Sequence, residues 1–342
     1  MRILLVTDAW RPQVNGVVRT LEEVTERIVA AGHDLRLISP SDYFTVPLPS
    51  YPEIKLSLVH SRSIRKVLRE FDPDQVHIAT EGPLGNAART ACLKEKRAFT
   101  TSYHTRFPEY LRTRLPIPLS WTYAWLRRFH NSGVACLVAT QTIADELTSR
   151  GFKTIVPWSR GVDHQLFRPR PQDSLAADLG WKRPVFMNVG RVSVEKNLEA
   201  FLGLDLPGVK VIVGDGPARA SLERQFPDAV FVGAHVGEDL ARYYAAADVF
   251  VFPSLTDTFG NVLLEALACG VPVAAFPVPG PLDVIGGSNA GALDADLRKA
   301  SLAALDIPRE NALAHAQGYS WEECVRIFLE AGQRCQIADA AA

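Results

Sequence analysis

The chain has 342 residues, of which 47% are hydrophobic and 22% are charged, and its formal net charge is −1 at pH 7. This is the composition of a globular protein long enough for two domains of ordinary size, and it excludes a disordered chain. No apolar run approaches the roughly 20 residues that span a bilayer as a helix, and Asp8 follows the first apolar residues too early for a signal peptide.

Short apolar strands alternate with helical patterns in the first half of the chain. A helix is predicted from Val17 to Ala31, with Gly32 as its left-handed cap. His77 falls within a strand and is expected in the core. The predicted strands are Ile3–Val6, Leu35–Ser39, Gln75–Ile78, Phe99–Ser102 and Cys136–Ala139.

The same alternation returns in the second half, after a stretch rich in Pro and Arg (157–171) that we interpret as a linker. A last amphipathic helix, Trp321 to Arg334, has no strand after it. The predicted strands are Val185–Val189, Val209–Val213, Val230–Val232, Val249–Phe252 and Val273–Ala275.

This alternation predicts an α/β fold of two Rossmann-like domains, each a doubly wound parallel sheet, that face each other across a cleft. We expect the first domain over residues 1–165 and the second over 166–320. The C-terminal segment 321–342 is expected to pack back on the first domain. Because ligands of such sheets bind beyond the carboxyl ends of the strands, the loops after the strands are candidate site loops.

The small net charge hides an asymmetry. Residues 1–165 carry 22 Lys and Arg against 16 Asp and Glu, and the remainder carries 15 against 22. A basic first half favours an anionic partner such as a membrane surface or a nucleic acid, although solvated faces often carry such an excess. The five cysteines are scattered without a Cys-x-x-Cys pair, which predicts reduced core thiols and a cytoplasmic location.

The most informative stretch is 254–272, where two acids lie eight positions apart across a glycine. Asp257 is expected on a loop, and Glu265 inside an apolar helix that begins near Gly260 and Asn261. A helix N-terminus attracts anions through its free amides and its dipole, and acids beside it can accept hydrogen bonds from sugar hydroxyls. The alternative is a loop acid and a solvated helix glutamate with no common role.

Two cations follow the strand Val185–Val189, at another helix start. Arg191 comes directly after Gly190, and Lys196 stands at the beginning of the helix. A guanidinium fork binds two oxygens and an ammonium acts as a point charge, so the pair suits a diphosphate. A solvated basic turn is the alternative.

Asn15 and Gly16 precede the first helix, where a glycine lets the backbone approach a phosphate closely. A tight turn without a ligand is the alternative. No dinucleotide fingerprint is present here, and Gly214-Asp-Gly-Pro217 does not supply one, because Arg219 occupies the position of the third glycine.

His104 comes just past the strand Phe99–Ser102, at the edge where ligands of parallel sheets bind. An imidazole in this position can exchange protons near neutral pH. A structural histidine is the alternative.

No metal site is predicted. The pair Asp72 and Asp74 has the spacing of a metal-nucleotide acid pair, but Pro73 and the strand that follows indicate a turn from helix to strand.

The stretch 106–130 mixes arginines with large aromatic residues around the single acid Glu109. Such a mixture can rest on anionic lipid or stack on a single-stranded nucleic acid. A core helix flanked by surface arginines is the third interpretation. The residues concerned are Arg106, Arg112, Arg114, Arg127, Arg128, Phe107, Tyr110, Trp121, Tyr123, Trp125 and Phe129.

Together these motifs resemble the retaining glycosyltransferases of family 4, which have the GT-B fold. The chain is most similar to the branch that glycosylates lipids: diacylglycerol glycosyltransferases, sulfoquinovosyltransferases and phosphatidylinositol mannosyltransferases. The resemblance covers nearly the whole chain and rests on the order and spacing of Pro12–Val17, Tyr103-His104-Thr105, Arg160-Gly-Val-Asp163, Gly190-Arg191, Lys196-Asn197, Gly214–Pro217 and Asp257–Glu265.

The resemblance implies a donor site in the second domain. Arg191 and Lys196 would hold the donor diphosphate and stabilise its charge as it leaves, next to Gly190. Gly16 would bring backbone amides to the same phosphates. Glu265 would accept hydrogen bonds from the ribose hydroxyls of the nucleotide.

The resemblance also implies how the donor sugar is held. Asp257 would accept a hydrogen bond from a sugar hydroxyl, and His104 would lie beside the sugar on the acceptor side. The family usually has glutamate where this chain has Asp257, so the sugar preference is open. Backbone around Phe259, Gly260 and Asn261 would touch the sugar and the phosphate.

The implied reaction is a retaining transfer of a hexose-type sugar from a UDP- or GDP-sugar to an acceptor hydroxyl, with no cofactor and no catalytic metal. The expected acceptor is a membrane lipid at the cytoplasmic face. The stretch 106–130 is expected on an anionic membrane surface at the inner face of the cell membrane, and no nucleic acid is expected as a partner. The alternatives are a soluble or polysaccharide acceptor, a nucleotide-sugar epimerase, and a non-catalytic nucleic-acid-binding protein.

Overall fold

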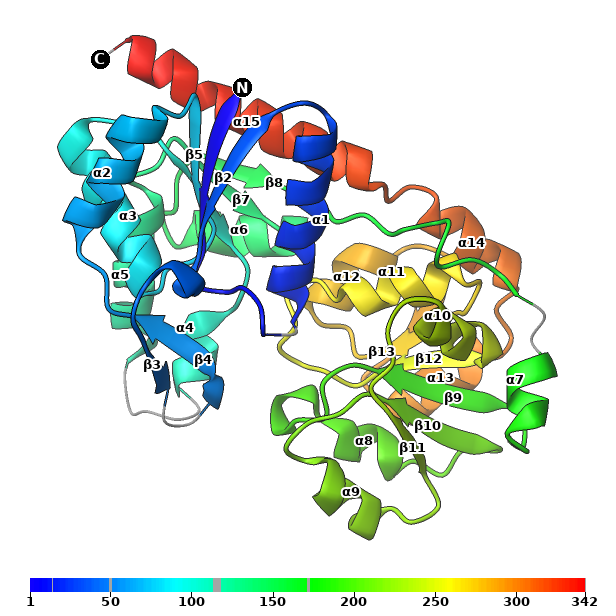
Figure 1. The fold of residues 1–342 in the computed structure, drawn as a ribbon. Coiled ribbons are helices and arrows are strands. Elements are labelled where there is room, and N and C mark those ends of the chain that lie inside the picture. Colours follow the sequence, from blue (N-terminus) through cyan, green and yellow to red (C-terminus); the bar gives the residue numbers. More distant parts are fainter. Residues whose placement is uncertain (14, 49–50, 113–117, 171–172, 342) are drawn as a thin grey trace. The chain divides into compact units, whose positions relative to one another are not determined.

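The computed structural model describes residues 1–13, 15–48, 51–112, 118–170 and 173–341 (Figure 1). It divides into two compact units: a first unit of Met1–Ser159 with Trp321–Ala342, and a second unit of Arg160–Ser320. The division lies earlier in the chain than the predicted boundary at 165. The stretch predicted as a linker is not a surface segment, because the side chains of Trp158 and Arg160 are buried.

The first unit contains a six-stranded parallel sheet with the strand order β2-β1-β5-β6-β7-β8. From β1 the chain passes to β2 on one side and later to β5 on the other, so the strand order reverses between β1 and β5. A separate antiparallel hairpin, β3 (Thr45–Leu48) and β4 (Tyr51–Ser57), follows β2. The sheet strands are β1 (Arg2–Val6), β2 (Asp34–Ile38), β5 (Gln75–Ile78), β6 (Thr100–Tyr103), β7 (Ala135–Val138) and β8 (Ile155–Pro157).

Helices cover both faces of this sheet because successive strand residues point to opposite sides. In β1, Ile3 packs with residues of α1 and α15, whereas Leu4 packs with residues of α2 and α3 (Figure 1). The helical elements of the first unit are α1 (Gly16–Ala30), the short η1 (Pro40–Asp42), α2 (Ser61–Phe71), α3 (Pro83–Glu95), α4 (Phe107–Arg112), α5 (Leu119–His130), α6 (Gln141–Ser149) and α15 (Trp321–Ala340).

The C-terminal helix α15 packs against α1 and against strands β5, β6 and β7. Its anchor is Trp158, which is fully buried and donates from Nε1 to the carbonyl oxygen of Cys324 at 2.9 Å. The ring of Trp158 also lies 5.7 Å from that of Phe328. The helix continues past its predicted end at Arg334.

The second unit has its own six-stranded parallel sheet, with the order β11-β10-β9-β12-β13-β14, so its strand order reverses between β9 and β12. Its strands are β9 (Val185–Val189), β10 (Val209–Val213), β11 (Val230–Gly233), β12 (Val249–Phe252), β13 (Val273–Ala275) and β14 (Gly291–Leu293). Its helical elements are α7 (Asp173–Asp178), η2 (Val194–Lys196), α8 (Leu198–Leu202), α9 (Arg219–Gln225), α10 (Gly237–Ala246), α11 (Asn261–Ala268), α12 (Pro279–Ile285), α13 (Leu297–Ala304) and α14 (Arg309–Ala316).

All strands predicted from the sequence are present, shifted by a residue at most, and Gly32 has the predicted left-handed conformation with φ +82°. His77 lies in the core as predicted, and all five cysteines are free and buried. The prediction missed β3, β4, β8 and β14. These strands are short or contain proline, so they carry little period-two signal. Among the described residues, no helix combines the length and apolar character needed to cross a membrane.

We expect Trp158→Ala to lower the free energy of unfolding of the first unit by about 3–5 kcal/mol, because the substitution leaves a cavity and removes the anchor of α15. Chemical denaturation followed by circular dichroism measures this change. The control is Trp121→Ala on α5. Because the Trp121 side chain is 73% exposed, this substitution should change the free energy of unfolding by about 0.5 kcal/mol or less. Equal effects in the two variants would show that α15 is not anchored by Trp158.

Candidate active site

The second unit gathers the predicted donor residues at the carboxyl edge of its sheet. Ligands of open parallel sheets bind where the strand order reverses, which here is between β9 and β12. The loop after β9 carries Gly190, Arg191 and Lys196, and the loop after β12 carries Asp257 and the start of α11. These two loops are therefore neighbours, although about sixty residues separate them in sequence.

Lys196 and Asp257 join the two loops. Lys196 Nζ lies 2.8 Å from Asp257 Oδ1 and 2.9 Å from Oδ2, and both side chains are largely shielded from solvent. Asn197 Nδ2 adds a hydrogen bond to the carbonyl oxygen of Pro253 at 3.0 Å. The structure thus brings together a cation and an acid that the sequence analysis treated as separate motifs.

The Arg191 loop is held by close backbone packing. The amide of Gly190 donates to Val213 O at 3.0 Å, and that of Val192 to Asp215 O at 2.9 Å. A Cβ on Gly214 would lie 1.8 Å from Gly190 O, so only glycine fits there. The motif Gly214–Pro217 is therefore a backbone support for Arg191.

The loop before α11 is shaped by two further glycines. Gly260 forms the left-handed N-cap of α11 with φ +89°, and no side chain caps this helix. A Cβ on Gly280 would lie 2.7 Å from Phe259 O and 3.1 Å from Asp257 O, so α12 supports the loop from behind. Phe259 is buried, with its ring 6.4 Å from that of Tyr319. Asn261 is the first residue of α11.

Glu265 is buried inside the second unit, with 3% of its surface exposed. Its Oε2 accepts a hydrogen bond from the hydroxyl of Tyr244, a fully buried residue of α10, at 2.8 Å. The alternative of a solvated helix glutamate is therefore wrong. Sequence reasoning did not find Tyr244, since nothing in the sequence indicates that α10 packs against α11.

In the first unit, the loop after β1 provides a structural acid. Asp8 accepts hydrogen bonds from the backbone amides of Leu84 (2.8 Å) and Gly85 (3.1 Å), and so caps α3 from another loop. Burial raises the pKa of Asp8, although these amides oppose the shift. Asp8 is therefore occupied as a helix cap.

Gly16 opens α1, but the amides around it are partly occupied. Asn15 Oδ1 accepts from the amides of Val17 and Val18, each at 3.0 Å. Within the described part of the chain, the amide of Gly16 has no such partner. If α1 contributes to anion binding, it does so through this amide.

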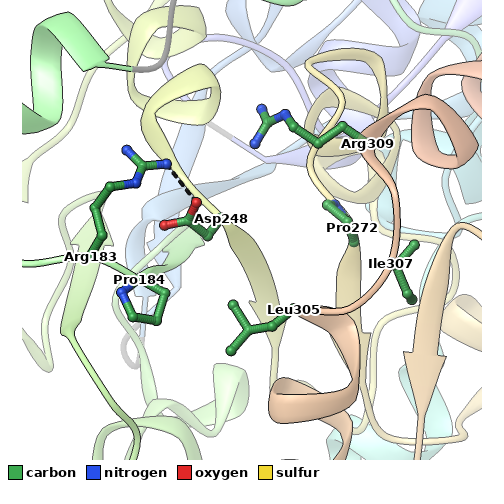
Figure 2. Close-up of a pocket in the computed structure, with 7 residues that line it drawn as sticks. All are labelled: Arg183, Pro184, Asp248, Pro272, Leu305, Ile307 and Arg309. Atoms are coloured by element: carbon green, nitrogen blue, oxygen red, sulfur yellow. Dashed lines mark hydrogen bonds and ion pairs between the residues drawn. The ribbon is translucent and has the colours of Figure 1, made fainter.

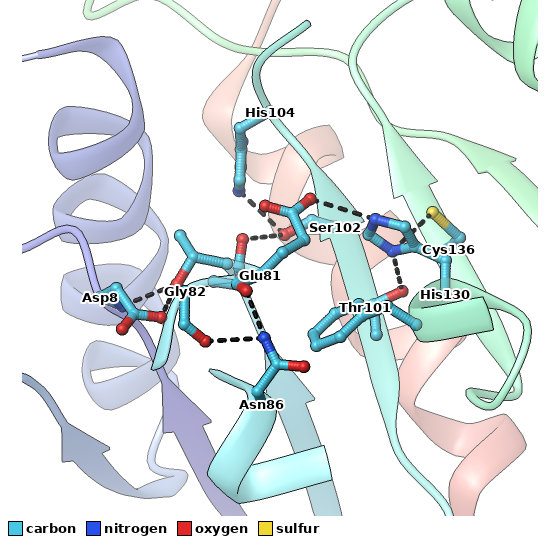
Figure 3. Close-up of polar contacts among 12 residues, drawn as sticks. Asp8, Glu81, Gly82, Asn86, Thr101, Ser102, His104, His130 and Cys136 are labelled. Carbon is cyan, nitrogen blue, oxygen red and sulfur yellow. Dashed lines mark hydrogen bonds and ion pairs between the residues drawn. The ribbon is translucent and has the colours of Figure 1, made fainter. Parts of the chain in front are cut away.

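His104 follows β6 and is held through Ser102. Its Nε2 lies 2.8 Å from Ser102 Oγ, which is also 3.1 Å from His77 Nε2 and 3.2 Å from Ala79 O (Figure 3). Burial lowers the pKa of His77 to about 3, so His77 is neutral. Ser102 Oγ donates to Ala79 O and so links His104 to the buried His77 and to the backbone after β5.

Glu81 and His130 form an ion pair that the sequence analysis missed. His130 is fully buried, with Nε2 at 3.1 Å from Glu81 Oε1 and Nδ1 at 2.9 Å from Thr101 Oγ1 (Figure 3). Burial lowers the pKa of His130, but the Cys136 sulfur and the Glu81 carboxylate outweigh it and raise this pKa to about 10. His130 is therefore an imidazolium at neutral pH. Glu81 lies in the loop after β5, so the rule that selected His104 could have selected it.

The basic and aromatic stretch 106–130 divides between core and surface. Arg106 pairs with Glu146 at 2.8 Å, and the hydroxyl of Tyr123 donates to Glu109 at 2.7 Å, so these residues are structural. The exposed members among the described residues are Phe107, Arg112, Trp121, Trp125, Arg127 and Arg128. Arg114 lies outside the described residues, as does the side chain of Tyr110.

A cavity of about 430 Å³ in the second unit lies at the opposite edge of the sheet (Figure 2). Its lining includes Pro184, Asp248 and Pro272, which directly precede β9, β12 and β13. Asp248 accepts from Arg183, and Arg309 donates to Ala247 O and Cys269 O, so these charges hold the amino ends of the strands together. In the described part of the chain, no group of three or more His, Cys, Asp or Glu residues is arranged to hold a metal ion.

Two family models match the chain. The model described as Glycosyltransferase Family 4 matches residues 14–166, and the one described as Glycosyl transferases group 1 matches residues 183–305.

Individual proteins are similar over most of the chain. A GDP-mannose-dependent alpha-mannosyltransferase of Corynebacterium glutamicum is 33% identical over 320 residues, 86% of this chain and 77% of the relative. An alpha-monoglucosyldiacylglycerol synthase of Streptococcus pneumoniae is 27% identical over 349 residues, 89% of this chain and 78% of the relative. The crystal structure of HepE from Anabaena in complex with UDP is 16% identical, with a TM-score of 0.74 over 96% of this chain and 99% of that chain.

The ion pair of His130 predicts a pH dependence. Because its pKa in the folded state exceeds the unfolded value of about 6.5, the pair's stabilisation is fully present below pH 6.5 and is lost as pH rises through about 10. Nitrogen-15 NMR of the histidine rings at pH 8 should find both nitrogens of His130 protonated in the native protein. Glu81→Gln should lower the pKa of His130, because it removes one of the two groups that raise it. A neutral His130 in the native protein would contradict the ion pair.

Proposed function

Because the chain belongs to glycosyltransferase family 4 and has the GT-B fold, we propose that it is a retaining hexosyltransferase that takes its sugar from a UDP- or GDP-sugar. Membership of this family makes the chain a hexosyltransferase and sets aside the non-catalytic nucleic-acid-binding alternative. The observation that carries the proposal is the Lys196–Asp257 contact, which unites a phosphate-binding cation and a hydroxyl-binding acid at the reversal point of the second sheet.

In this proposal the diphosphate lies over the loop after β9. An ammonium has three donors, of which Lys196 directs two at Asp257, so one remains for a phosphate oxygen. Arg191 adds a guanidinium fork on the same loop. Glu265, held by Tyr244, accepts from the ribose hydroxyls, and Asp257 from a hydroxyl of the donor sugar.

The chemical step follows from these charges. The bond from the anomeric carbon to the diphosphate breaks, and the diphosphate takes the electron pair while the sugar becomes cationic. Fixed cations and uncapped helix amides stabilise the departing anion. The acceptor hydroxyl attacks from the side of the leaving group, and its proton passes to the departing phosphate. In this scheme side-chain cations neutralise the diphosphate, so we expect transfer to persist in excess EDTA.

We expect Lys196→Ala and Arg191→Ala each to lower kcat by about 100-fold or more, because each removes a cation that stabilises the leaving diphosphate. Transfer from radiolabelled UDP-glucose and GDP-mannose measures the loss, and circular dichroism checks the fold. Arg242→Ala, on the exposed side of α10, is the control with unchanged activity. Near-normal turnover in both loop variants would contradict the phosphate-binding role.

Incubation of the protein with the donor alone tests the alternative that it is a nucleotide-sugar epimerase. An epimerase of the same fold would convert the donor sugar without an acceptor. A transferase leaves the donor unchanged apart from slow hydrolysis.

We further propose that the acceptor is a membrane lipid and that the chain acts as a peripheral protein on the inner face of the cell membrane. The relative from Streptococcus pneumoniae is named for the synthesis of a glucosyldiacylglycerol, which supports a lipid. On α5 the exposed side chains include Trp121, Trp125 and Arg128, while Leu126 and Phe129 face the core. An aromatic and cationic helix face suits the interface of an anionic bilayer.

We expect the triple variant Trp121→Ser, Arg112→Gln, Arg128→Gln to bind phosphatidylglycerol vesicles at least tenfold more weakly, since each basic residue near such a surface contributes about 1 kcal/mol. Vesicle co-sedimentation at fixed ionic strength measures binding. Ile337→Ser on α15 removes an equally exposed apolar side chain elsewhere in the first unit and should bind normally. Unchanged binding of the triple variant would locate the membrane contact elsewhere.

A further inference from the structure

We infer that Glu81 binds a hydroxyl group of the acceptor and that the buried His130 positions it for this purpose, an inference that rests on the transferase function proposed above. It adds an acceptor-binding residue to the first unit, where the donor-site motifs assign none.

The position of Glu81 in the fold is the first argument. It lies in the loop between β5 and α3, at the carboxyl edge of the first sheet and at the point where its strand order reverses. Asp8, in the loop after the neighbouring strand β1, is occupied as the cap of α3. Of these two carboxylates, only that of Glu81 is left partly available for a ligand by its contacts with the described residues.

The contacts of its carboxylate are the second argument. Oε1 accepts from His130 Nε2 at 3.1 Å, whereas Oε2 has no hydrogen-bond partner among the described residues. The side chain is 19% exposed, so a ligand can reach it. In Figure 3 the carboxylate lies between His130 and His104. A carboxylate accepts several hydrogen bonds, and its free oxygen suits a hydroxyl donor.

The rigidity of the site is the third argument. Asn86 Nδ2 donates to the carbonyl oxygens of both Glu81 (2.5 Å) and Gly82 (3.0 Å), which fixes the loop to α3. A Cβ on Gly82 would lie 2.4 Å from the Asp8 carboxyl carbon, so the loop packs closely on the Asp8 side chain in the loop after β1. Behind the carboxylate, His130 is held by Thr101 at 2.9 Å. Such support orients a binding group before its ligand arrives.

Charge defines the ligand class. His130 donates to Glu81 Oε1, so the other carboxylate oxygen offers an acceptor that suits a neutral hydroxyl group and not an anionic phosphate. A hydroxyl on the neutral headgroup of a lipid fits this single free carboxylate oxygen.

The test compares Glu81→Gln with the native protein, using diacylglycerol in phosphatidylglycerol vesicles as acceptor and UDP-glucose or GDP-mannose as donor. We expect transfer to fall about 100-fold with a raised KM for diacylglycerol. Thermal stabilisation by UDP or GDP should be unchanged, because the proposed donor site is in the second unit. Glu95→Gln, a carboxylate of α3 that pairs with Arg65 and Arg69, is the matched control with normal transfer.

His130 is tested as a positioning residue. His130→Leu should raise the KM for diacylglycerol more than it lowers kcat, and His130→Gln, whose amide can still donate to Glu81, should recover most of the loss. If Glu81→Gln fails to fold, Glu81→Asp keeps the charge but shortens the reach, and it should show the same rise in KM.

The outcomes separate the two proposals. Normal transfer by Glu81→Gln, even with lowered thermal stability, would mean that the pair is only structural and would overturn the inference. A native protein that transfers neither sugar to diacylglycerol would contradict the proposed function, and the inference would fall with it. Loss of transfer together with loss of nucleotide binding would also overturn it.

Discussion

The reversal of strand order in each parallel sheet is the constraint on which the candidate sites depend. When consecutive strands are added to opposite sides of a first strand, the loops at their carboxyl ends diverge and leave an opening that backbone does not fill. In the second unit this brings the loops of Lys196 and Asp257 into hydrogen-bond contact. In the first unit it places the loops of Asp8 and Glu81 side by side.

A second theme is that two of the proposed ligand-binding carboxylates are each held by a buried polar partner. Glu265 accepts from Tyr244 and Glu81 from His130, and both partners are fully buried. A buried donor fixes the orientation of a carboxylate, at the cost of desolvating a polar group that must remain paired. Gly214 and Gly280 add support in the second unit by letting loops pack backbone to backbone.

Much of this was predictable from the sequence, for reasons visible in particular residues. The strands around Val185 and Val249 are apolar runs bounded by turn residues, so their existence could be predicted without the fold. His104 and the Arg191 loop could be selected because they follow such strands. Tyr244, His130 and the pairing of Lys196 with Asp257 could not, because each depends on a contact between elements far apart in sequence.

The sequence by itself determined the α/β class, the alternation of strands and helices, and the residue types of a diphosphate site, because these follow from local periodicity and chemistry. Tertiary structure alone decided which charges meet. It joined Lys196 to Asp257, buried Glu265 beside Tyr244, and turned His130, a member of an apparently basic and aromatic surface stretch, into the buried partner of Glu81. The physical reason is that burial and pairing are properties of packed neighbours, which no single segment specifies.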